Sequence, residues 1–222
     1  MGAPVPVIAI DGPSASGKGT VAERVAAALG FRYLDSGALY RLVTLAALDR
    51  AVDLGDEDAL ARLAESMQVD FRDGRTYLEA RDVSGSLRSE PVSAAASRVA
   101  AHPAVRRALL SRQRGFRTPP GLVADGRDMG SVVFPDAPLK VFLTADVAAR
   151  AERRYKQLME KGMYAKMDAV VDELRRRDER DSSRPVAPLK HYPDAIFLDT
   201  TGLTAEKAAQ EILDRWRERA QG

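Results

Sequence analysis

The chain has no cysteine, and this absence removes several kinds of chemistry at once. A protein without cysteine has no disulfide, no thiolate zinc site and no cysteine nucleophile. Its only histidines are His102 and His191, which are too few to make a histidine metal cluster. Asparagine is absent as well, which argues against the Asn-Lys-x-Asp motif with which GTPase switches commonly read guanine. We therefore expect no metal held by protein ligands alone.

Strong net charge, dense aromatic residues and long apolar runs are missing too. A net charge of +2 and an aromatic content of 6% do not indicate a basic, stacking-rich surface for nucleic acid. No segment approaches the length of a membrane-spanning helix, and the first residues lack the features of a signal peptide. We expect a cytoplasmic protein that binds neither nucleic acid nor membranes. Its 222 residues suit one large α/β domain with small insertions.

The most informative stretch lies near the N-terminus. The apolar run 7–10 predicts a buried strand, a glycine-rich turn follows, and residues 21–29 favour a helix that ends at Gly30. Strand, Gly-x-x-x-x-Gly-Lys and helix together are typical of a phosphate-binding loop, in which backbone N–H groups and the helix N-terminus attract polyphosphate. A glycine-rich turn that binds nothing is the alternative. The residues predicted to bind nucleotide phosphates are Gly12, Pro13, Ser14, Ala15, Ser16, Gly17, Lys18, Gly19 and Thr20.

One position departs from the common form of this loop. Gly19 follows Lys18 where Ser or Thr is usual, and the hydroxyl group comes one residue later, at Thr20. The common hydroxyl is a ligand of Mg²⁺. The sequence therefore leaves the direct ligands of Mg²⁺ open.

Five apolar runs separated by helical segments predict a doubly wound, five-stranded parallel sheet. After the first run, they occupy residues 31–35, 122–125, 139–143 and 195–199. Residues 67–88 predict a small inserted antiparallel sheet with strands at 69–72, 76–80 and 83–87 and a turn at 73–74, although a solvent-facing hairpin describes them equally well. Ligands of such folds bind beyond the carboxyl ends of the parallel strands.

Two groups of polar residues are expected at those strand ends. Asp35, Ser36 and Arg41 could grip a second ligand, or Ser36 could be a plain N-cap and Arg41 a solvated helix residue. In the turn at 125–130, Arg127 can bind phosphate with a bidentate fork, while Asp128 can bind a base or ribose or hold Arg127. An internal salt-bridged turn is the alternative there.

Charged residues dominate two helices expected at 146–161 and 168–181. Arg177 and Arg180 share a helix face, and Arg184 precedes a proline. These helices offer little apolar face to bury. They are either a solvated surface element or a mobile lid that brings arginines over transferring phosphates, with Asp178 and Asp181 positioning those arginines.

Together these motifs resemble bacterial cytidylate kinase over essentially the whole chain. Gly-Lys-Gly-Thr at 17–20 is similar to the loop variant of nucleoside monophosphate kinases, but it is generic by itself. Asp-Ser-Gly-Ala-Leu-Tyr-Arg at 35–41 and Asp-Gly-Arg-Asp-Met-Gly at 125–130 are far more specific. Further matching stretches lie at 82–85, 133–137 and 177–181.

The resemblance implies an enzyme of pyrimidine nucleotide metabolism, a monomer that phosphorylates CMP and dCMP with ATP and carries Mg²⁺ as Mg-ATP. It implies one P-loop kinase domain over 1–222, with a monophosphate-binding region at 36–118 and a helical lid at 150–184. Rival readings are a kinase for another monophosphate or for shikimate, and a GTPase-type switch.

The resemblance also implies roles for individual residues. Arg41 and Arg106 would take the acceptor phosphate, and Ser97 would help to read cytosine or its ribose. The residues implied to be catalytic are Lys18, Arg127, Arg177 and Arg184. The residues expected to bind substrate are Asp35, Ser36, Arg41, Ser97, Arg106, Arg127, Asp128, Arg177, Asp181 and Arg184.

Overall fold

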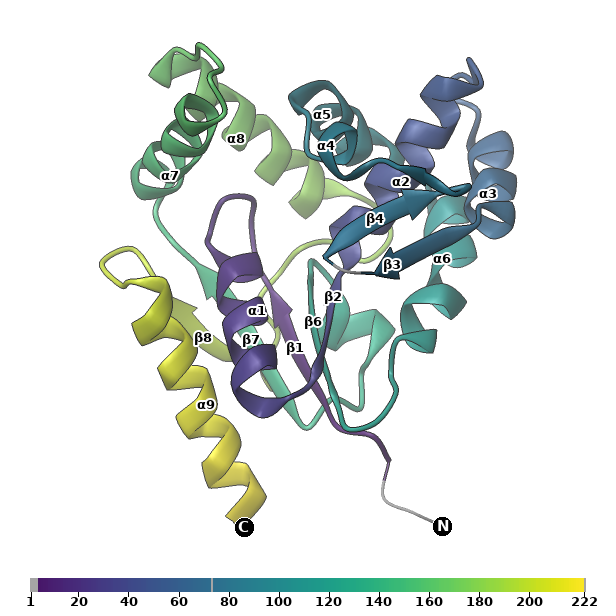
Figure 1. The fold of residues 1–222 in the computed structure, drawn as a ribbon. Coiled ribbons are helices and arrows are strands. Elements are labelled where there is room, and N and C mark those ends of the chain that lie inside the picture. Colours follow the sequence, from purple (N-terminus) through teal and green to yellow (C-terminus); the bar gives the residue numbers. More distant parts are fainter. Residues whose placement is uncertain (1–3, 73, 222) are drawn as a thin grey trace. The chain divides into compact units, whose positions relative to one another are not determined.

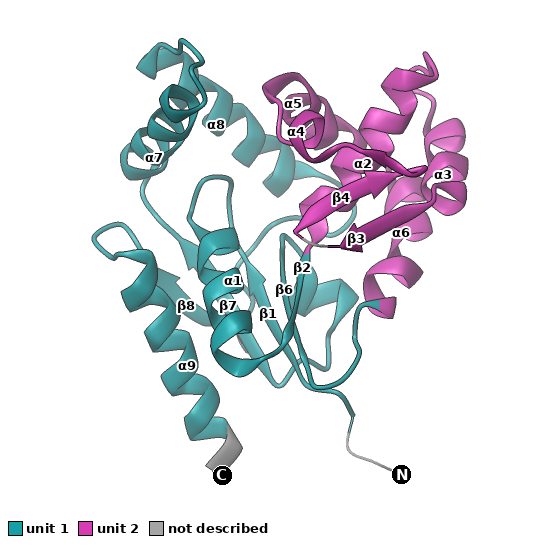
Figure 2. Ribbon diagram, viewed as in Figure 1, with its two compact units in different colours: residues 1–34, 116–222 teal, residues 35–115 magenta. Residues whose placement is uncertain are grey.

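A computed structural model describes residues 4–72 and 74–221. The chain forms two compact units, coloured separately in Figure 2. The first unit comprises residues 1–34 and 116–222, and the second comprises residues 35–115. Within the described ranges, no helix combines the length and apolarity needed to cross a bilayer.

A five-stranded parallel sheet organises the first unit (Figure 1), as the sequence predicts. Its strands are β1 (Val7–Asp11), β2 (Arg32–Asp35), β6 (Leu122–Gly126), β7 (Leu139–Thr144) and β8 (Ile196–Asp199), in the order β2-β6-β1-β7-β8. All five residues of β1 are buried. A continuous apolar run therefore becomes the central strand of a parallel sheet, where both faces are covered.

Helices α1 (Lys18–Leu29) and α9 (Ala205–Gln221) pack against each other and share one apolar core with the sheet. Val21 and Val25 of α1 and Ile212 of α9 meet β-strand side chains in this core. The sequence predicts α1 and its end at Gly30, which adopts a left-handed conformation. The core fixes the start of α1 at the carboxyl end of β1, where the predicted phosphate-binding loop lies.

Two helices of the first unit form a hairpin, α7 (Val147–Glu160) and α8 (Met167–Ser183). Asp146 caps α7, because its carboxylate accepts a hydrogen bond from Ala149 N–H at 2.6 Å. The sequence predicts little apolar face on these helices, and the core that they share is small. Their shared small core consists of Ala151, Leu158, Val170 and Leu174, with Ala15 of the loop after β1 packed against it.

The second unit combines helices with a small sheet. Its helices are α2 (Ser36–Asp49), α3 (Glu57–Ser66), α4 (Ser84–Leu87), α5 (Glu90–Val99) and α6 (Pro103–Gly115). Helix α2 packs on α5, and α3 packs on α6. Pro103 begins α6, because proline is tolerated in the first turn of a helix.

The small sheet confirms the predicted insertion and corrects its third strand. Strands β3 (Val69–Arg72), β4 (Arg75–Leu78) and β5 (Arg81–Asp82) pair antiparallel in sequence order. The strand expected at 83–87 is wrong, because α4 occupies most of that stretch. Asp82 accepts hydrogen bonds from the N–H and the hydroxyl of Ser84, at 3.0 and 2.7 Å, and so starts a helical turn. Asp73 of the predicted turn lies outside the described residues.

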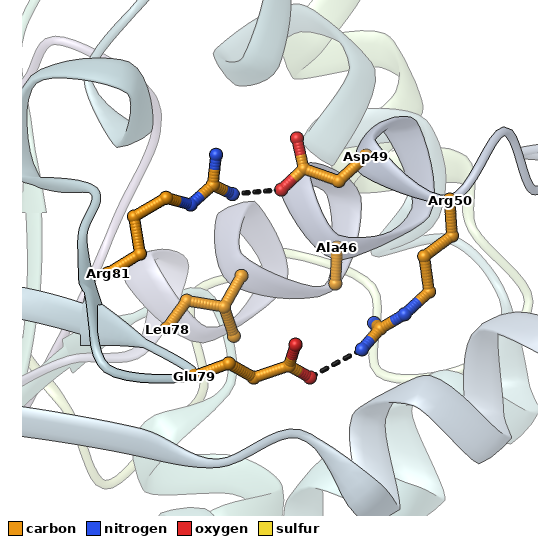
Figure 3. Close-up of a pocket in the computed structure, with 6 residues that line it drawn as sticks. All are labelled: Ala46, Asp49, Arg50, Leu78, Glu79 and Arg81. Carbon is orange, nitrogen blue, oxygen red and sulfur yellow. Dashed lines mark hydrogen bonds and ion pairs between the residues drawn. The ribbon is translucent and has the colours of Figure 1, made fainter.

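The turn between β4 and β5 is held in an unusual backbone conformation. Glu79 and Ala80 both have positive φ, 51° and 68°, which non-glycine residues adopt only at a cost. Two ion pairs tie the flanks of this turn to the end of α2, Arg50 with Glu79 and Arg81 with Asp49 (Figure 3). They border a pocket of about 450 Å³ whose four charged side chains thus pair with one another. These contacts to α2 compensate for the strained turn.

Replacing Ala80 with glycine should stabilise the protein by about 1 kcal/mol, since glycine adopts positive φ without steric cost. Chemical denaturation followed by circular dichroism measures the change. The matched control is Ala61→Gly within α3, which should lose about 1 kcal/mol because glycine weakens a helix interior. A loss of stability in both variants would contradict this account of the turn.

Candidate functional site

The loop after β1 is shaped by a close approach to β7. A Cβ atom at Gly12 would lie 1.9 Å from the carbonyl oxygen of Leu143, so no larger residue fits. Lys18 begins α1 and donates from Nζ to the carbonyl oxygen of Pro13 at 3.1 Å. Ser16 is fully buried, and its hydroxyl has no hydrogen-bond partner among the described residues. A helix N-terminus, a lysine and a spare hydroxyl group are therefore gathered in one loop, an arrangement suited to an anion.

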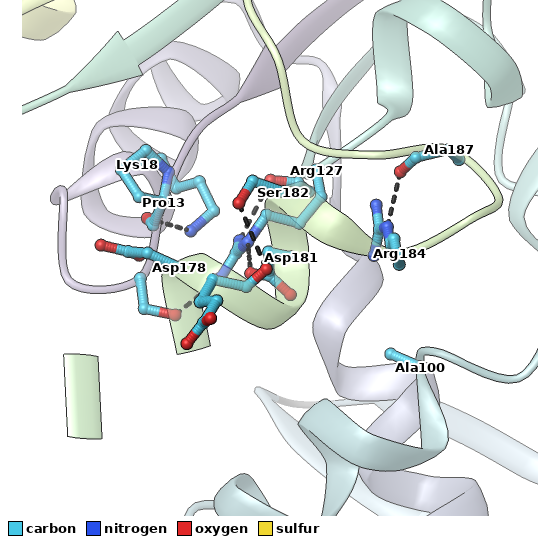
Figure 4. Close-up of polar contacts among 12 residues, drawn as sticks. Pro13, Lys18, Ala100, Arg127, Asp178, Asp181, Ser182, Arg184 and Ala187 are labelled. Carbon is cyan, nitrogen blue, oxygen red and sulfur yellow. Dashed lines mark hydrogen bonds and ion pairs between the residues drawn. The ribbon is translucent and has the colours of Figure 1, made fainter. Parts of the chain in front are cut away.

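Arg127, in the turn after β6, reaches that loop. Its Nη2 donates to Oγ of Ser14 at 2.8 Å, and its Nε donates to Oδ2 of Asp181 in α8 at 2.7 Å. Figure 4 shows Arg127 and Asp181 pointing toward each other. Burial alone would lower the pKa of Arg127, but the carboxylates of Asp181 and Asp125 outweigh burial and raise that pKa above its usual value. Arg127 is thus a permanent positive charge beside the loop.

The ion pair with Asp181 links this turn to a helix that is distant in the sequence. From the sequence, a carboxylate within the turn, such as Asp128, could hold Arg127. In the structure, the Nε of Arg127 donates to Asp181, which lies 54 positions along the chain. Burial would raise the pKa of Asp181, but the charge of Arg127 overcomes burial and lowers that pKa below its usual value. The turn is therefore bound to α8 as well as to the loop.

Further positive charge comes from α8 and the residue that follows it. Burial lowers the pKa of Arg177 to about 10, and the charge of Arg127 acts in the same direction. Arg177 therefore stays protonated at neutral pH, and its buried Nε has no hydrogen-bond partner among the described residues. Arg184 is also buried and donates from Nε to the carbonyl oxygen of Ala187 at 2.5 Å. The charges of Arg127, Arg177 and Arg184, together with that of Lys18, suit a highly charged polyanion.

Two arginines of α7 were not among the candidate site residues. Arg150 is buried and donates to the carbonyl oxygen of Ser14 at 3.2 Å, and it pairs with Asp178 of α8 at 2.6 Å. Arg153 donates to the carbonyl oxygen of Ser16 at 3.1 Å. Their spacing of three residues on one helix was visible in the sequence, but their acceptors were not. Asp178 thus positions an arginine of α7, and Asp181 positions Arg127.

A pocket of about 280 Å³ lies against the outer side of the same loop. Residues of the loop, α1, α7 and the start of α9 line it, with both polar and apolar side chains. The lining residues are Ala15, Ser16, Gly17, Thr20, Val21, Arg153, Lys156, Gln157, Glu160, Thr200, Leu203, Thr204, Ala205 and Ala208. The pocket adjoins the phosphate-binding residues, so it can take the nucleoside part of a nucleotide.

In the second unit, the structure contradicts the interpretation that Ser36 is a plain N-cap and Arg41 a solvated helix residue. Asp35, and not Ser36, caps the helix by accepting a hydrogen bond from Ala38 N–H at 3.1 Å. Asp35 also forms an ion pair with Arg41, so Arg41 is not a solvated helix residue. The Nε of Arg41 is buried without a hydrogen-bond partner among the described residues. Asp35 therefore orients an arginine that retains a spare donor.

The remaining candidates of the second unit lie on α5 and α6. Ser97 in α5 has a buried hydroxyl group that lacks a hydrogen-bond partner within the described part of the chain. Arg106 in α6 is mostly buried, donates to the carbonyl oxygen of Ala100 at 3.1 Å and lies over the ring of Tyr40. Because α2 and α5 pack together, Arg41 and Ser97 belong to adjacent helices.

Carboxylates and histidines do not gather into a metal site in the ranges 4–72 and 74–221. No group of three or more potential metal-ligating side chains occurs there. The carboxylate nearest the loop, Asp11, is engaged by the N–H groups of Met129 and Gly130 and by the hydroxyl of Tyr192.

Comparison with protein families gives a match over most of the chain. A family model described as cytidylate kinase matches residues 8–218. The chain is 59% identical over 212 residues to a cytidylate kinase of Bordetella bronchiseptica, covering 96% of this chain and 95% of that protein. It is 57% identical over 218 residues to a cytidylate kinase of Burkholderia thailandensis, covering 98% of this chain and 96% of that protein.

Solved structures give a consistent but more distant likeness. An uncharacterized protein from Eubacterium ventriosum aligns with a TM-score of 0.53 at 14% identity, over 95% of this chain and 97% of that one. A gluconokinase from Sinorhizobium meliloti aligns with a TM-score of 0.50 at 16% identity, over 98% and 96% of the two chains. At such identities these structures are evidence for the fold alone.

The ion pair between Arg127 and Asp181 should make stability depend on pH. Asp181→Asn leaves a buried guanidinium without its partner and should cost about 3 kcal/mol near pH 7. Because folding lowers the pKa of Asp181 below 3.8, its contribution is complete above that value and is lost as the pH falls through the lowered pKa.

Urea unfolding of the wild type and Asp181→Asn between pH 7 and pH 3 measures this difference. The control Asp214→Asn removes an exposed ion pair with Arg217 and should change stability by less than about 1 kcal/mol. A difference between the wild type and Asp181→Asn that does not shrink toward acid pH would count against the pairing.

Proposed function

The chain belongs to the cytidylate kinase family, and from this premise we infer that it transfers the terminal phosphoryl group of ATP to CMP and dCMP, giving the diphosphates and ADP. The observation that carries the proposal is the position of Arg127, which bridges the phosphate-binding loop at Ser14 and helix α8 at Asp181. A permanent positive charge at that point suits a phosphoryl group in transfer.

In the proposed mechanism the loop from Gly12 to Thr20 binds the triphosphate of ATP. Lys18, Arg127, Arg177 and Arg184 are the catalytic residues, because their charges neutralise the phosphoryl group in transfer. An oxygen of the acceptor phosphate is the nucleophile, and it is already ionised near neutral pH because the second pKa of such a phosphate is about 6. The reaction then needs positioning and charge stabilisation without a general base.

Each unit by itself carries residues that we assign to the acceptor nucleotide. In the second unit, Asp35, Ser36, Arg41, Ser97 and Arg106 would bind it, with Arg41 and Arg106 on its phosphate. The spare donors at Arg41 and Ser97 support these assignments. In the first unit, Arg127, Asp128, Arg177, Asp181 and Arg184 are assigned to the monophosphate. Arg127 and Asp128 are also assigned to reading cytosine or its ribose, as is Ser97 of the second unit.

Within one P-loop kinase domain over 1–222, we assign residues 36–118 to monophosphate binding and residues 150–184 to a lid. The lid assignment is supported by the small apolar core that α7 and α8 share. It is also supported by Arg150 and Arg153, which bind carbonyl oxygens of the phosphate-binding loop. A lid that excludes water would favour transfer to CMP over hydrolysis of ATP.

The donor set fits Mg²⁺ that enters with ATP. The described residues offer no cluster of ligands, and the nearby Asp11 is occupied by its own hydrogen bonds. An ion held chiefly by phosphates and water needs no such cluster. When bound, Mg²⁺ supplies charge neutralisation between the phosphates. In this proposal, Gly17, Lys18 and Thr20 would contact those phosphates.

The pocket of about 280 Å³ beside the loop is the proposed site of the adenosine of ATP. We further propose that the protein acts as a monomer in the cytoplasm, within pyrimidine nucleotide metabolism. Similarity to cytidylate kinases over nearly the full chain supports the metabolic assignment.

A coupled assay of ADP release tests the function. It uses Mg-ATP with CMP, dCMP, UMP, AMP, GMP and shikimate in parallel reactions. Fast turnover with CMP and dCMP alone is the expected result. Faster turnover with another acceptor would overturn the substrate assignment, and no stimulation by any acceptor would overturn the kinase proposal.

Replacing Arg127 with alanine should lower kcat with CMP by about a thousandfold, because one arginine on a transferring phosphoryl group contributes on that order. ATP binding, measured by calorimetry, should change little. Arg215→Ala is the control, since Arg215 is exposed on α9 and pairs only weakly with Glu218. Near-normal turnover of Arg127→Ala would remove Arg127 from the mechanism.

A further inference from the structure

Asp11 is a fully buried carboxylate at the end of β1, directly before Gly12 of the phosphate-binding loop. Three donors converge on it. The N–H groups of Met129 and Gly130 lie 2.8 and 2.9 Å from its oxygens, and the hydroxyl of Tyr192 lies 2.6 Å away. Met129 is two residues after Arg127, and Tyr192 belongs to the stretch between α8 and β8. One carboxylate thus joins three segments that are far apart in the sequence.

The contact between Asp11 and Tyr192 requires glycine at position 130. A Cβ atom there would lie 2.2 Å from the hydroxyl oxygen of Tyr192 and 3.0 Å from its ring carbon. Only glycine therefore lets the backbone N–H and the tyrosine hydroxyl reach the same carboxylate oxygen. Gly130 and Tyr192 fit each other although 62 positions separate them, which is not expected of an incidental contact.

Lys140 holds Tyr192 from another direction. The ammonium group of Lys140 lies 5.8 Å from the centroid of the Tyr192 ring and forms an ion pair with Asp194 at 2.5 Å. Lys140 is largely buried, and its strand β7 is the neighbour of β1 in the sheet. The ring of Tyr192 is therefore fixed relative to the central strands.

The hydrogen bonds to Asp11 offset the cost of burying its carboxylate. Burial raises the pKa of Asp11, while the hydrogen bonds from Gly130 and Tyr192 oppose that effect. Burial and the nearby charge of Asp11 raise the pKa of Tyr192, so its hydroxyl remains a donor. A buried carboxylate that loses a donor is costly, and the three segments are therefore held in one arrangement.

We propose that Asp11 and Tyr192 are positioning residues for phosphoryl transfer, which hold the Arg127 turn in register with the phosphate-binding loop without touching substrate. The inference rests on the proposed function. Asp11 is covalently next to the loop and is hydrogen-bonded to the residues after Arg127 and Asp128. A shift of about 1 Å in such a group can cost about a hundredfold in rate, so a second anchor for the turn has a catalytic consequence.

Tyr192→Phe tests the proposal, because it removes one hydroxyl group and leaves the ring. We expect kcat with CMP to fall about tenfold while KM for ATP changes less than about twofold, since the loss affects positioning in the transition state. Asp11→Asn, which replaces one acceptor oxygen with a donor, should lower kcat further. An unchanged kcat in Tyr192→Phe would overturn the inference.

A double-mutant cycle with Arg127→Lys separates positioning from general destabilisation. If Tyr192 acts through the Arg127 turn, Tyr192→Phe should lower kcat less than about threefold when Arg127 is already lysine. Ile212→Val, which shortens a core side chain of α9, is the structural control. It should lower the melting temperature and leave kcat unchanged, whether residue 127 is arginine or lysine.

The outcomes distinguish this inference from the proposed function. If the wild type is active on CMP but the effects of Tyr192→Phe and Arg127→Lys on kcat simply multiply, the positioning role alone is overturned. A wild type that is itself inactive on CMP would overturn the proposed function and, with it, the inference.

Discussion

The buried ion pair of Arg127 and Asp181 is the interaction on which the arrangement of the first unit's charged residues depends. Their side chains are only 19% and 10% exposed, so an isolated charge at either position would cost several kcal/mol. The same guanidinium binds Ser14, and therefore α8, the end of β6 and the phosphate-binding loop share one anchor. Arg177, next to this pair, adds a charge whose Nε has no hydrogen-bond partner among the described residues. The cluster thus carries excess positive charge beside the loop.

Several cationic side chains donate to backbone carbonyl oxygens, which are modest acceptors. Lys18 binds the carbonyl of Pro13, and Arg184 binds that of Ala187. In the second unit, Arg106 binds the carbonyl of Ala100. A phosphate oxygen carries negative charge, so it is a stronger acceptor for a cationic donor than a neutral carbonyl oxygen is. Each of these contacts is therefore weaker than the contact that the same side chain would make with a phosphate oxygen.

The sequence predicts those features that local physics determines. Buried strands appear as apolar runs, and Gly30, Asp146 and Pro103 mark helix boundaries. The phosphate-binding loop is recognised by spacing, and its strand and helix are where the motif requires them. What the sequence does not determine is pairing over long separations. Asp181 as the partner of Arg127, and Tyr192 as the partner of Asp11, become evident only in the folded chain. Helix α4 was missed because the hydrogen bonds of Asp82 to Ser84 outweigh the strand pattern of the residues that follow.

The most direct test of the central claim is a crystal structure of the enzyme with a bisubstrate analogue, in which a polyphosphate chain joins adenosine to cytidine. The account predicts that the guanidinium of Arg127 contacts the phosphoryl group between the two nucleosides, at about 3 Å from its oxygens. It also predicts that the adenosine phosphates lie in the loop from Gly12 to Thr20. An analogue bound with its phosphates away from this loop, and with Arg127 still held only by Asp181 and Ser14, would contradict the account.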